Sequence, residues 1–169
     1  MANYDNIKLI RVDERLIHGQ VVTQWLNKSE ANKIIIVDQF LSTNDFLSNV
    51  YVMAAPAGTD VLVLNPEDFM KKINNNELNA GKYLILFKLI DNLKKCFDLG
   101  FSPSEIQIGN VGSSDDRKVV YQSVSLSETE AKDLLELQNK NIKVYFQQVP
   151  GEKPVDLNEI IKKHFSNLN

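Results

Sequence analysis

The chain has a single cysteine, Cys96, and only two histidines, His18 and His164. One cysteine excludes an intramolecular disulfide and a zinc site built from several cysteines. Any histidine chemistry must use His18 or His164. The 22 acidic and 19 basic residues give a formal charge of -3. Because nucleic-acid binding requires clustered lysine and arginine, this balance argues against a nucleic-acid partner.

Long apolar runs are also missing. Runs such as residues 34–37 and 84–87 are far shorter than the ~20 apolar residues of a transmembrane helix. Charged residues stand near the start of the chain, where a signal peptide would carry its apolar segment. We therefore expect a cytoplasmic protein that does not itself insert into a membrane and reaches one only through a partner.

Short apolar runs typical of strands alternate along the chain with amphipathic segments typical of helices. Most of the runs are continuous, as expected of buried parallel strands, whereas residues 119–126 alternate apolar and polar side chains and favour a half-exposed edge strand. The predicted strands are residues 7–12, 33–37, 60–64, 83–87, 105–108, 119–126 and 143–146. This alternation predicts an α/β fold, a three-layer sandwich around a mainly parallel sheet of about six to seven strands, in which an edge strand can be antiparallel. No linker interrupts the pattern, so residues 1–169 are expected to form one domain.

Residues typical of helix ends occur in the segments between the predicted strands, which supports the prediction that these segments are helices. Ser127 and Glu130 have the capping-box spacing, Pro66 suits a first helical turn, and Gly100 suits a helix end. Helices are predicted after the first strand, over residues 43–55 and 91–99, from Pro66, after Ser127 and over residues 156–165. Ligand sites of parallel sheets lie beyond the carboxyl ends of the strands. The loops expected at that edge are residues 13–18, 38–42, 65–66, 88–90 and 109–116.

The first of these loops lies within the sequence RVDERLIHGQV, residues 11–21. A neutral imidazole such as His18 can attack phosphorus, and the phosphoryl group then requires cations and hydrogen-bond donors. Arg11 and Arg15 offer forked guanidinium donors, and a helix N-terminus adds free N–H groups. Gly19 removes a Cβ where a phosphoryl group must approach. Asp13 either caps the turn or orients the imidazole or an arginine.

Each of these residues also has an interpretation without chemistry. A lone loop histidine is often a surface residue, Arg11 could face solvent at a strand end, and Arg15 could form a surface ion pair with Glu14. A second set, Gly112, Ser113 and Ser114, follows a strand and could form only a turn or could donate hydrogen bonds to phosphate. The two arginines beside one histidine are therefore the informative feature.

The sequence RVDERLIHGQV resembles the active-site signature of the mannose/fructose/sorbose-type IIB subunits of the bacterial sugar phosphotransferase system (PTS). The similarity continues more weakly through IIIVD, MAAPAG and IGNVG, residues 34–38, 53–58 and 108–112. One departure is that the family often continues NVG with a second glycine and an apolar residue. Here Ser113 and Ser114 follow, and two aspartates come next.

The resemblance implies that His18 takes a phosphoryl group from the phosphohistidine of a IIA domain and passes it to a sugar imported through the membrane subunits IIC and IID. It implies that Arg11 and Arg15 lie near that histidine. Peripheral association with the membrane would follow from the transporter complex, and a homodimer is left open. We expect no metal or organic cofactor, because the arginines and the helix N-terminus supply the charge.

Two other functions compete with this interpretation. A histidine-phosphatase-like enzyme also places histidine and arginine after its first strand, but it requires contiguous Arg-His-Gly and a second active-site histidine. Here Arg15 and His18 are separated by two residues, and His164 lies in the last predicted helix. A non-catalytic phosphate-sensing module of the same fold is the other alternative.

Overall fold

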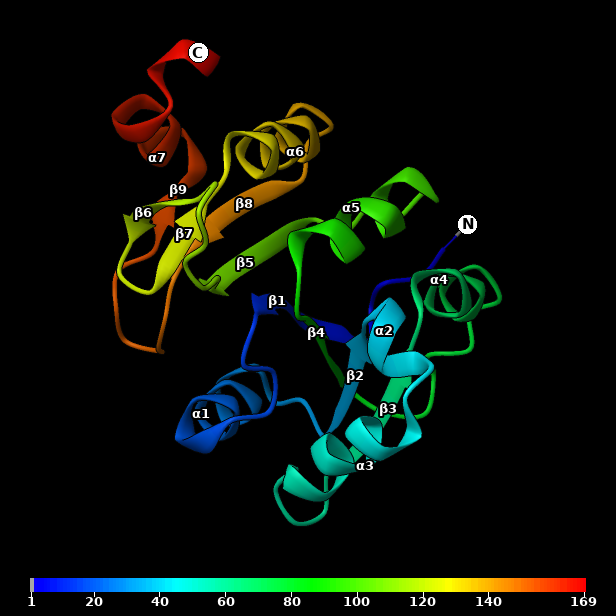
Figure 1. Ribbon diagram of the computed structural model, residues 1–169. Coiled ribbons are helices and arrows are strands. Elements are labelled where there is room, and N and C mark those ends of the chain that lie inside the picture. Colours follow the sequence, from blue (N-terminus) through cyan, green and yellow to red (C-terminus); the bar gives the residue numbers. More distant parts are fainter. Residues whose placement is uncertain (1) are drawn as a thin grey trace.

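The computed structural model describes residues 2–169, and Figure 1 shows a central sheet with helices on both faces. The strands are β1 (Ile7–Asp13), β2 (Lys33–Val37), β3 (Asp60–Leu64), β4 (Tyr83–Phe87), β5 (Glu105–Asn110), β6 (Lys118–Tyr121), β7 (Val124–Leu126), β8 (Lys143–Phe146) and β9 (Val155–Asp156). The helices are α1 (Gly19–Ser29), α2 (Gln39–Ser42), α3 (Asp45–Ala54), α4 (Pro66–Asn74), α5 (Ile90–Asp98), α6 (Glu128–Asn139) and α7 (Leu157–His164), followed by the short 3-10 helix η1 (Ser166–Leu168).

The main sheet has seven strands in the order β3-β2-β4-β1-β5-β8-β9. Its neighbouring strands are parallel except β8 and β9, which are antiparallel. β1 therefore lies inside the sheet, between β4 and β5 (Figure 1). The predicted α/β sandwich around a mainly parallel sheet is confirmed, and its antiparallel edge strand is β9.

Two apolar layers cover the sheet because successive strand residues point to opposite faces. On one face, Ile34 and Ile36 of β2 pack with buried side chains of α1. On the other face, Ile35 of β2 and Phe87 of β4 pack with buried side chains of α4, α5, α6 and α7. A continuous apolar run such as β2 is thus buried on both sides.

The prediction of one edge strand over residues 119–126 is wrong. The segment forms an antiparallel hairpin, β6 and β7, in a separate two-stranded sheet. Tyr121 pairs with Val124, so the turn contains only Gln122 and Ser123, and Gln122 has a positive φ of 36°. Two-residue hairpin turns usually contain glycine or asparagine, which makes them recognisable in a sequence. This turn has neither residue, so the alternation of apolar and polar side chains continues across it and predicts one strand instead of two.

Several helix ends follow the predicted residues. Ser127 and Glu130 form both bonds of the capping box at α6, and Pro66 is the first residue of α4. The helix predicted over residues 43–55 begins later, at Asp45, with Asn44 as its cap. The short α2 lies outside the predicted elements, and β9 takes Asp156 from the helix predicted over residues 156–165, which begins at Leu157. Within the described chain, no helix is both long and apolar enough to cross a membrane.

Candidate functional site

The loop from the carboxyl end of β1 to the start of α1 can be followed in Figure 1. His18 is the last residue of this loop, immediately before α1. Its side chain is exposed, and it forms no capping bond to α1 within residues 2–169. The first N–H groups of an α-helix have no partner inside the helix, so they are available to an anion at this end. The predicted location of His18 at the mouth of the loop between β1 and α1 agrees with the structure.

The loop that carries His18 is held by two buried apolar side chains. Leu16 is 2% exposed and Ile17 is 6% exposed, and both pack in the apolar layer beneath α1. The Leu16 N–H donates to the Asp13 carbonyl at 2.9 Å, which closes a turn. Leu16 has a φ of 55°, a left-handed conformation that costs a non-glycine residue about 1–3 kcal/mol. Burial of Leu16 stabilises this strained turn and fixes the direction in which the loop leaves β1.

Gly19 follows His18 with a φ of +55°, which explains why a glycine is used there. A Cβ at this position would meet no other described atom within 4 Å. Apart from its own chain neighbours, no described residue therefore crowds Gly19.

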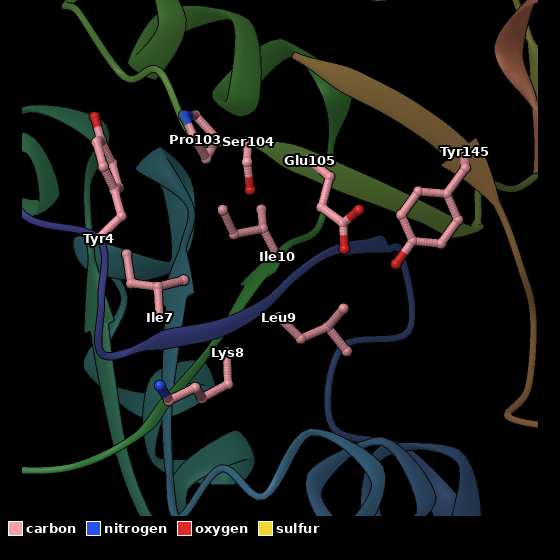
Figure 2. Close-up of a pocket in the computed structure, with 9 residues that line it drawn as sticks. All are labelled: Tyr4, Ile7, Lys8, Leu9, Ile10, Pro103, Ser104, Glu105 and Tyr145. Atoms are coloured by element: carbon pink, nitrogen blue, oxygen red, sulfur yellow. The ribbon is translucent and has the colours of Figure 1, made fainter.

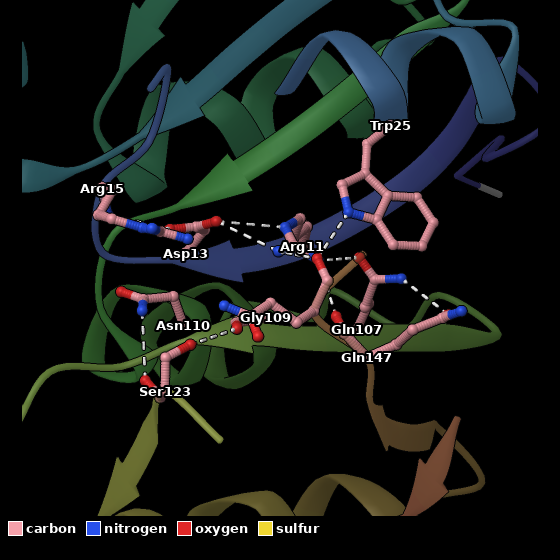
Figure 3. A network of polar contacts seen from close by, with 10 residues as sticks. Arg11, Asp13, Arg15, Trp25, Gln107, Gly109, Asn110, Ser123 and Gln147 are labelled. Atoms are coloured by element: carbon pink, nitrogen blue, oxygen red, sulfur yellow. Dashed lines mark hydrogen bonds and ion pairs between the residues drawn. The ribbon is translucent and has the colours of Figure 1, made fainter. Parts of the chain in front are cut away.

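Asp13 lies between the two arginines at the end of β1 (Figure 3). One of its oxygens accepts hydrogen bonds from Arg11, from Nε at 3.4 Å and from Nη2 at 3.3 Å. The other oxygen accepts from the backbone N–H of Arg15 at 3.0 Å and lies 3.6 Å from the Arg15 Nε. The geometry fits both roles predicted for Asp13, because its side chain caps the turn through the Arg15 N–H and orients the Arg11 guanidinium.

Arg11 is buried, and its guanidinium is directed into the protein. It donates to the Gln107 side chain and, at 2.9 Å each, to the carbonyls of Gln147 and Gln148. It also lies 5.3 Å from the ring centroid of Trp25. These bonds and those to Asp13 occupy the guanidinium. Arg11 therefore neither faces solvent nor offers free donors to a phosphoryl group, so both predictions for it are wrong. It instead holds Asp13 in place.

Burial lowers the pKa of the Arg11 guanidinium, while the Asp13 carboxylate opposes this effect. Arginine keeps its charge in proteins, so Arg11 is a buried cation that neutralises Asp13. Gly109 in β5 makes room for it, since a Cβ there would lie 2.1 Å from the Arg11 Cζ.

Arg15 is arranged differently. Its side chain is 36% exposed, yet its Nε and Nη2 atoms are shielded from solvent and have no hydrogen-bond partner in the described chain. Shielded donors without an acceptor are rare in folded proteins. Both donors belong to a permanent cation, whose charge is complementary to an anionic acceptor. The ion pair predicted between Arg15 and Glu14 is not formed, because Glu14 is directed to another loop.

The loop after β5 brings the second predicted set beside the first. The Gly112 N–H, predicted as a phosphate donor, donates instead to the Glu14 Oε2 at 2.6 Å. Ser113 and Ser114 are exposed, and the Ser114 hydroxyl donates to Asp116 at 2.6 Å. Gly112 is therefore engaged by a carboxylate of the protein, whereas phosphate binding by Ser113 and Ser114 stays a prediction.

Sequence reasoning missed the residues that hold Arg11. Gln107 is fully buried in β5, where it pairs with Arg11 of β1. Gln147 and Gln148 follow β8, at the next position in the sheet. A signal was present, because an arginine inside an apolar strand must find acceptors once it is buried. The identity of those acceptors depends on strand order, which the sequence alone does not specify.

His164 and the enclosed cavity lie away from this loop. His164 ends α7, which packs on the opposite face of the sheet from α1. A cavity of about 110 Å³ lies between the amino-terminal parts of β1 and β5 (Figure 2). It exists because pairing between these strands begins only at Arg11 and Gln107. Both features are therefore separate from the edge that carries His18.

Comparisons with known proteins give matches over most of this chain. The family model described as "PTS system sorbose subfamily IIB component" matches residues 7–169. The crystal structure of manxB from Thermoanaerobacter tengcongensis is 38% identical, with a TM-score of 0.86, and the match covers 94% of this chain and 96% of that one. The fructose-specific EIIB component of Bacillus subtilis is 23% identical over 157 residues, which cover 93% of this chain and 96% of the relative. The mannose-specific EIIAB component of Escherichia coli is 22% identical over 95% of this chain, which spans 50% of that relative's length.

Fold and site together define an α/β domain with a single exposed histidine between its first strand and first helix. The family match covers nearly the whole chain and includes that loop. The chain belongs to the sorbose subfamily of PTS IIB components. It is accordingly a phosphotransferase subunit of a sugar phosphotransferase system.

Proposed function

We propose that His18 is the residue that carries the phosphoryl group, receiving it from a phosphohistidine of a IIA protein and passing it to a sugar. The observation that carries this proposal is the pair of shielded, unpartnered donors on Arg15, three positions before the exposed His18. These donors and the free N–H groups at the start of α1 would bind the phosphoryl oxygens.

Asp13 and Arg11 act through Arg15 in this proposal. Asp13 holds the Arg15 backbone N–H at 3.0 Å, and Arg11 neutralises Asp13 from the buried side. A carboxylate so close to the site would otherwise repel a phosphoryl dianion. Gly19 leaves room for the donor protein to approach, and the N–H groups around it supply further hydrogen bonds.

The first transfer is balanced without a net proton transfer. The unprotonated ring nitrogen of His18 attacks phosphorus, while the N–P bond of the donor phosphohistidine breaks and its electron pair stays on the donor ring. His18 becomes a phosphorylated imidazolium, and the donor becomes a neutral imidazole. In the second transfer a sugar hydroxyl oxygen bonds to phosphorus while the N–P bond of His18 breaks. Its electron pair returns to the ring, which becomes a neutral imidazole, and the hydroxyl proton passes to water. The protein contributes positioning and charge stabilisation to both steps.

The partners follow from the same chemistry. PTS IIB components work with a IIA component and with the membrane subunits IIC and IID. The Escherichia coli relative is itself named as an EIIAB component, which supports a IIA donor for this chain. We propose that IIC and IID supply the sugar acceptor and hold this subunit at the membrane.

The test is phosphorylation by a purified phospho-IIA protein of the same transport system. The expected product is a phosphoprotein that is labile in acid and stable in base. His18→Ala should abolish it, whereas the matched variant His164→Ala should be phosphorylated like the unaltered protein. Phosphorylation that persists in His18→Ala would overturn the proposal.

The same preparation tests the two alternatives. A histidine-phosphatase-like enzyme would hydrolyse a simple phosphomonoester without partners, but its second histidine would have to be His164, on the opposite face of the sheet. A phosphate-sensing module would keep its phosphoryl group when membranes containing the cognate transporter and sugar are added. We expect no hydrolysis and complete transfer to sugar.

A further inference from the structure

Glu14 connects the loop of His18 to the loop that follows β5. Its Oε2 atom accepts a hydrogen bond of 2.6 Å from the Gly112 N–H. Its own backbone N–H donates to the Asn110 carbonyl at 3.0 Å. These two bonds join the loops at the point where β1 and β5 end, beside Asp13.

The contact forms as it does because residue 112 is a glycine, since a Cβ there would displace the Glu14 carboxylate. A Cβ there would lie 2.2 Å from Oε2 and 3.3 Å from Cδ of Glu14. The three atoms nearest to that position all belong to Glu14. The backbone of Gly112 is not left-handed, so the requirement comes from space and not from φ. Gly112 and Glu14 are thus matched to each other.

Arg117 holds the same loop from its other end. It donates to the Gly112 carbonyl at 3.0 Å and lies 4.0 Å from the Glu14 Oε1. It also forms an ion pair of 2.6 Å with Glu130, the capping-box residue of α6. The loop is therefore anchored to the rigid start of a helix on one side and to Glu14 on the other.

The charge of Glu14 gives this contact a consequence for phosphoryl transfer. Glu14 lies on the same loop as the phosphoryl acceptor and adjacent to Arg15. A carboxylate free to move there would oppose an incoming phosphoryl group. The Gly112 N–H and Arg117 hold it on the neighbouring loop, where it is 33% exposed.

We propose that Glu14 is a positioning residue that fixes the loop of residues 112–116 against the His18 loop and keeps its own charge away from the phosphoryl site. This inference rests on the proposed function of His18. Glu14→Gln retains an acceptor for the Gly112 N–H and removes the charge. Glu14→Ala removes both. Gly112→Ala displaces the carboxylate but leaves it charged.

The experiment measures the maximal rate at which saturating phospho-IIA phosphorylates His18, at a temperature where circular dichroism shows every variant folded. Glu14→Gln should stay within about threefold of the unaltered protein. Glu14→Ala should lose about tenfold, and Gly112→Ala about a hundredfold, in line with the cost of small displacements in active sites. The double variant Glu14→Ala/Gly112→Ala should regain the rate of Glu14→Ala alone, because the atom that clashes is gone. Glu77→Ala, at a surface ion pair with Lys72, is the matched control and should not change the rate.

Amide NMR supplies a measurement that does not depend on activity. The Gly112 N–H signal should lie downfield in the unaltered protein and move upfield in Glu14→Ala. An unchanged phosphorylation rate in Glu14→Ala would overturn the proposal for Glu14. The same holds if the double variant is as slow as Gly112→Ala. Neither result would affect the proposed function of His18. Failure of the unaltered protein to become phosphorylated on His18 would overturn both.

Discussion

Arg11 donates two hydrogen bonds, of 3.4 and 3.3 Å, to one oxygen of Asp13, two positions further along β1. Residues two apart in a strand share a face, so both side chains lie beneath α1. The other oxygen of Asp13 accepts from the Arg15 N–H at 3.0 Å. Asp13 thus connects a buried cation, whose donors are all bonded, to Arg15, whose Nε and Nη2 form no hydrogen bond within residues 2–169. The two arginines of the motif therefore have separate roles.

Replacing Arg11 should affect stability first. Arg11→Met leaves the Asp13 carboxylate without its buried cation and the Gln147 carbonyl without its donor, whereas the Gln148 carbonyl keeps the Trp25 indole N–H. Breaking a buried ion pair in this way destabilises a protein by about 3–5 kcal/mol. Urea unfolding should show a loss of this size, whereas Lys28→Met, at an exposed cation of α1, should change the free energy of unfolding by less than about 0.5 kcal/mol. A loss below about 1 kcal/mol for Arg11→Met would contradict the buried role.

Replacing Arg15 should affect activity first. Arg15→Gln removes the two shielded donors while keeping a polar side chain of similar length. If they bind the phosphoryl group, the rate of His18 phosphorylation should fall on the order of a hundredfold, as for the loss of one oxyanion donor. The free energy of unfolding should change by less than about 1 kcal/mol, because Arg15 is 36% exposed and only 3.6 Å contacts tie it to Asp13. A normal rate would exclude Arg15 from the site.

Gly109→Ala should disturb the buried cation directly. The new Cβ would lie 2.1 Å from the Arg11 Cζ, and the guanidinium cannot retreat because the carbonyls of Gln147 and Gln148 hold it. Overpacking of this kind costs about 1–3 kcal/mol. Trp25, the single tryptophan of the sequence, contacts Arg11 and should report the change through its fluorescence. Gly81→Ala is the matched control, since its Cβ meets the flexible side chain of Lys33.

The sequence was sufficient for the layers of the fold because apolar periodicity and helix caps are local signals. Short buried strands such as β2 and β4 and the capping box at Ser127 required no knowledge of neighbours. The hairpin after β5 was missed because its turn uses Gln122 in a left-handed conformation instead of glycine. Local patterns are reliable where the usual residue occupies a turn and fail where another residue does.

The sequence predicted which residues form the candidate site, but it did not predict which residues they contact. The motif indicated that Arg11, Asp13, Arg15 and His18 belong together, since they share one strand and one loop. The role of Arg11 depends on Gln107 and on the loop after β8, which strand order brings beneath it. The engagement of Gly112 by Glu14 depends on two loops 98 residues apart in the sequence. Such long-range pairings are consequences of topology, which a single motif does not contain.

Tyr145 should make the stability of the protein fall at alkaline pH. Burial, with a smaller effect of the Glu105 carboxylate, raises the pKa of Tyr145 from 10.0 to about 12. Both side chains lie at the cavity between β1 and β5 (Figure 2). Between these two pH values the unfolded chain has lost the phenolic proton while the folded chain keeps it. Unfolding then releases a proton, so the free energy of unfolding decreases as the pH rises.

Tyr145→Phe removes this proton and only one long hydrogen bond, of 3.5 Å from Gln107. The unaltered protein should therefore lose stability relative to Tyr145→Phe as the pH rises above 10.0, and the difference should be constant below it. Urea unfolding of both proteins from pH 8 to pH 11.5 measures the difference, since the other tyrosines titrate in both. Parallel curves over the whole range would show that the Tyr145 hydroxyl ionises as readily in the folded chain as in the unfolded one.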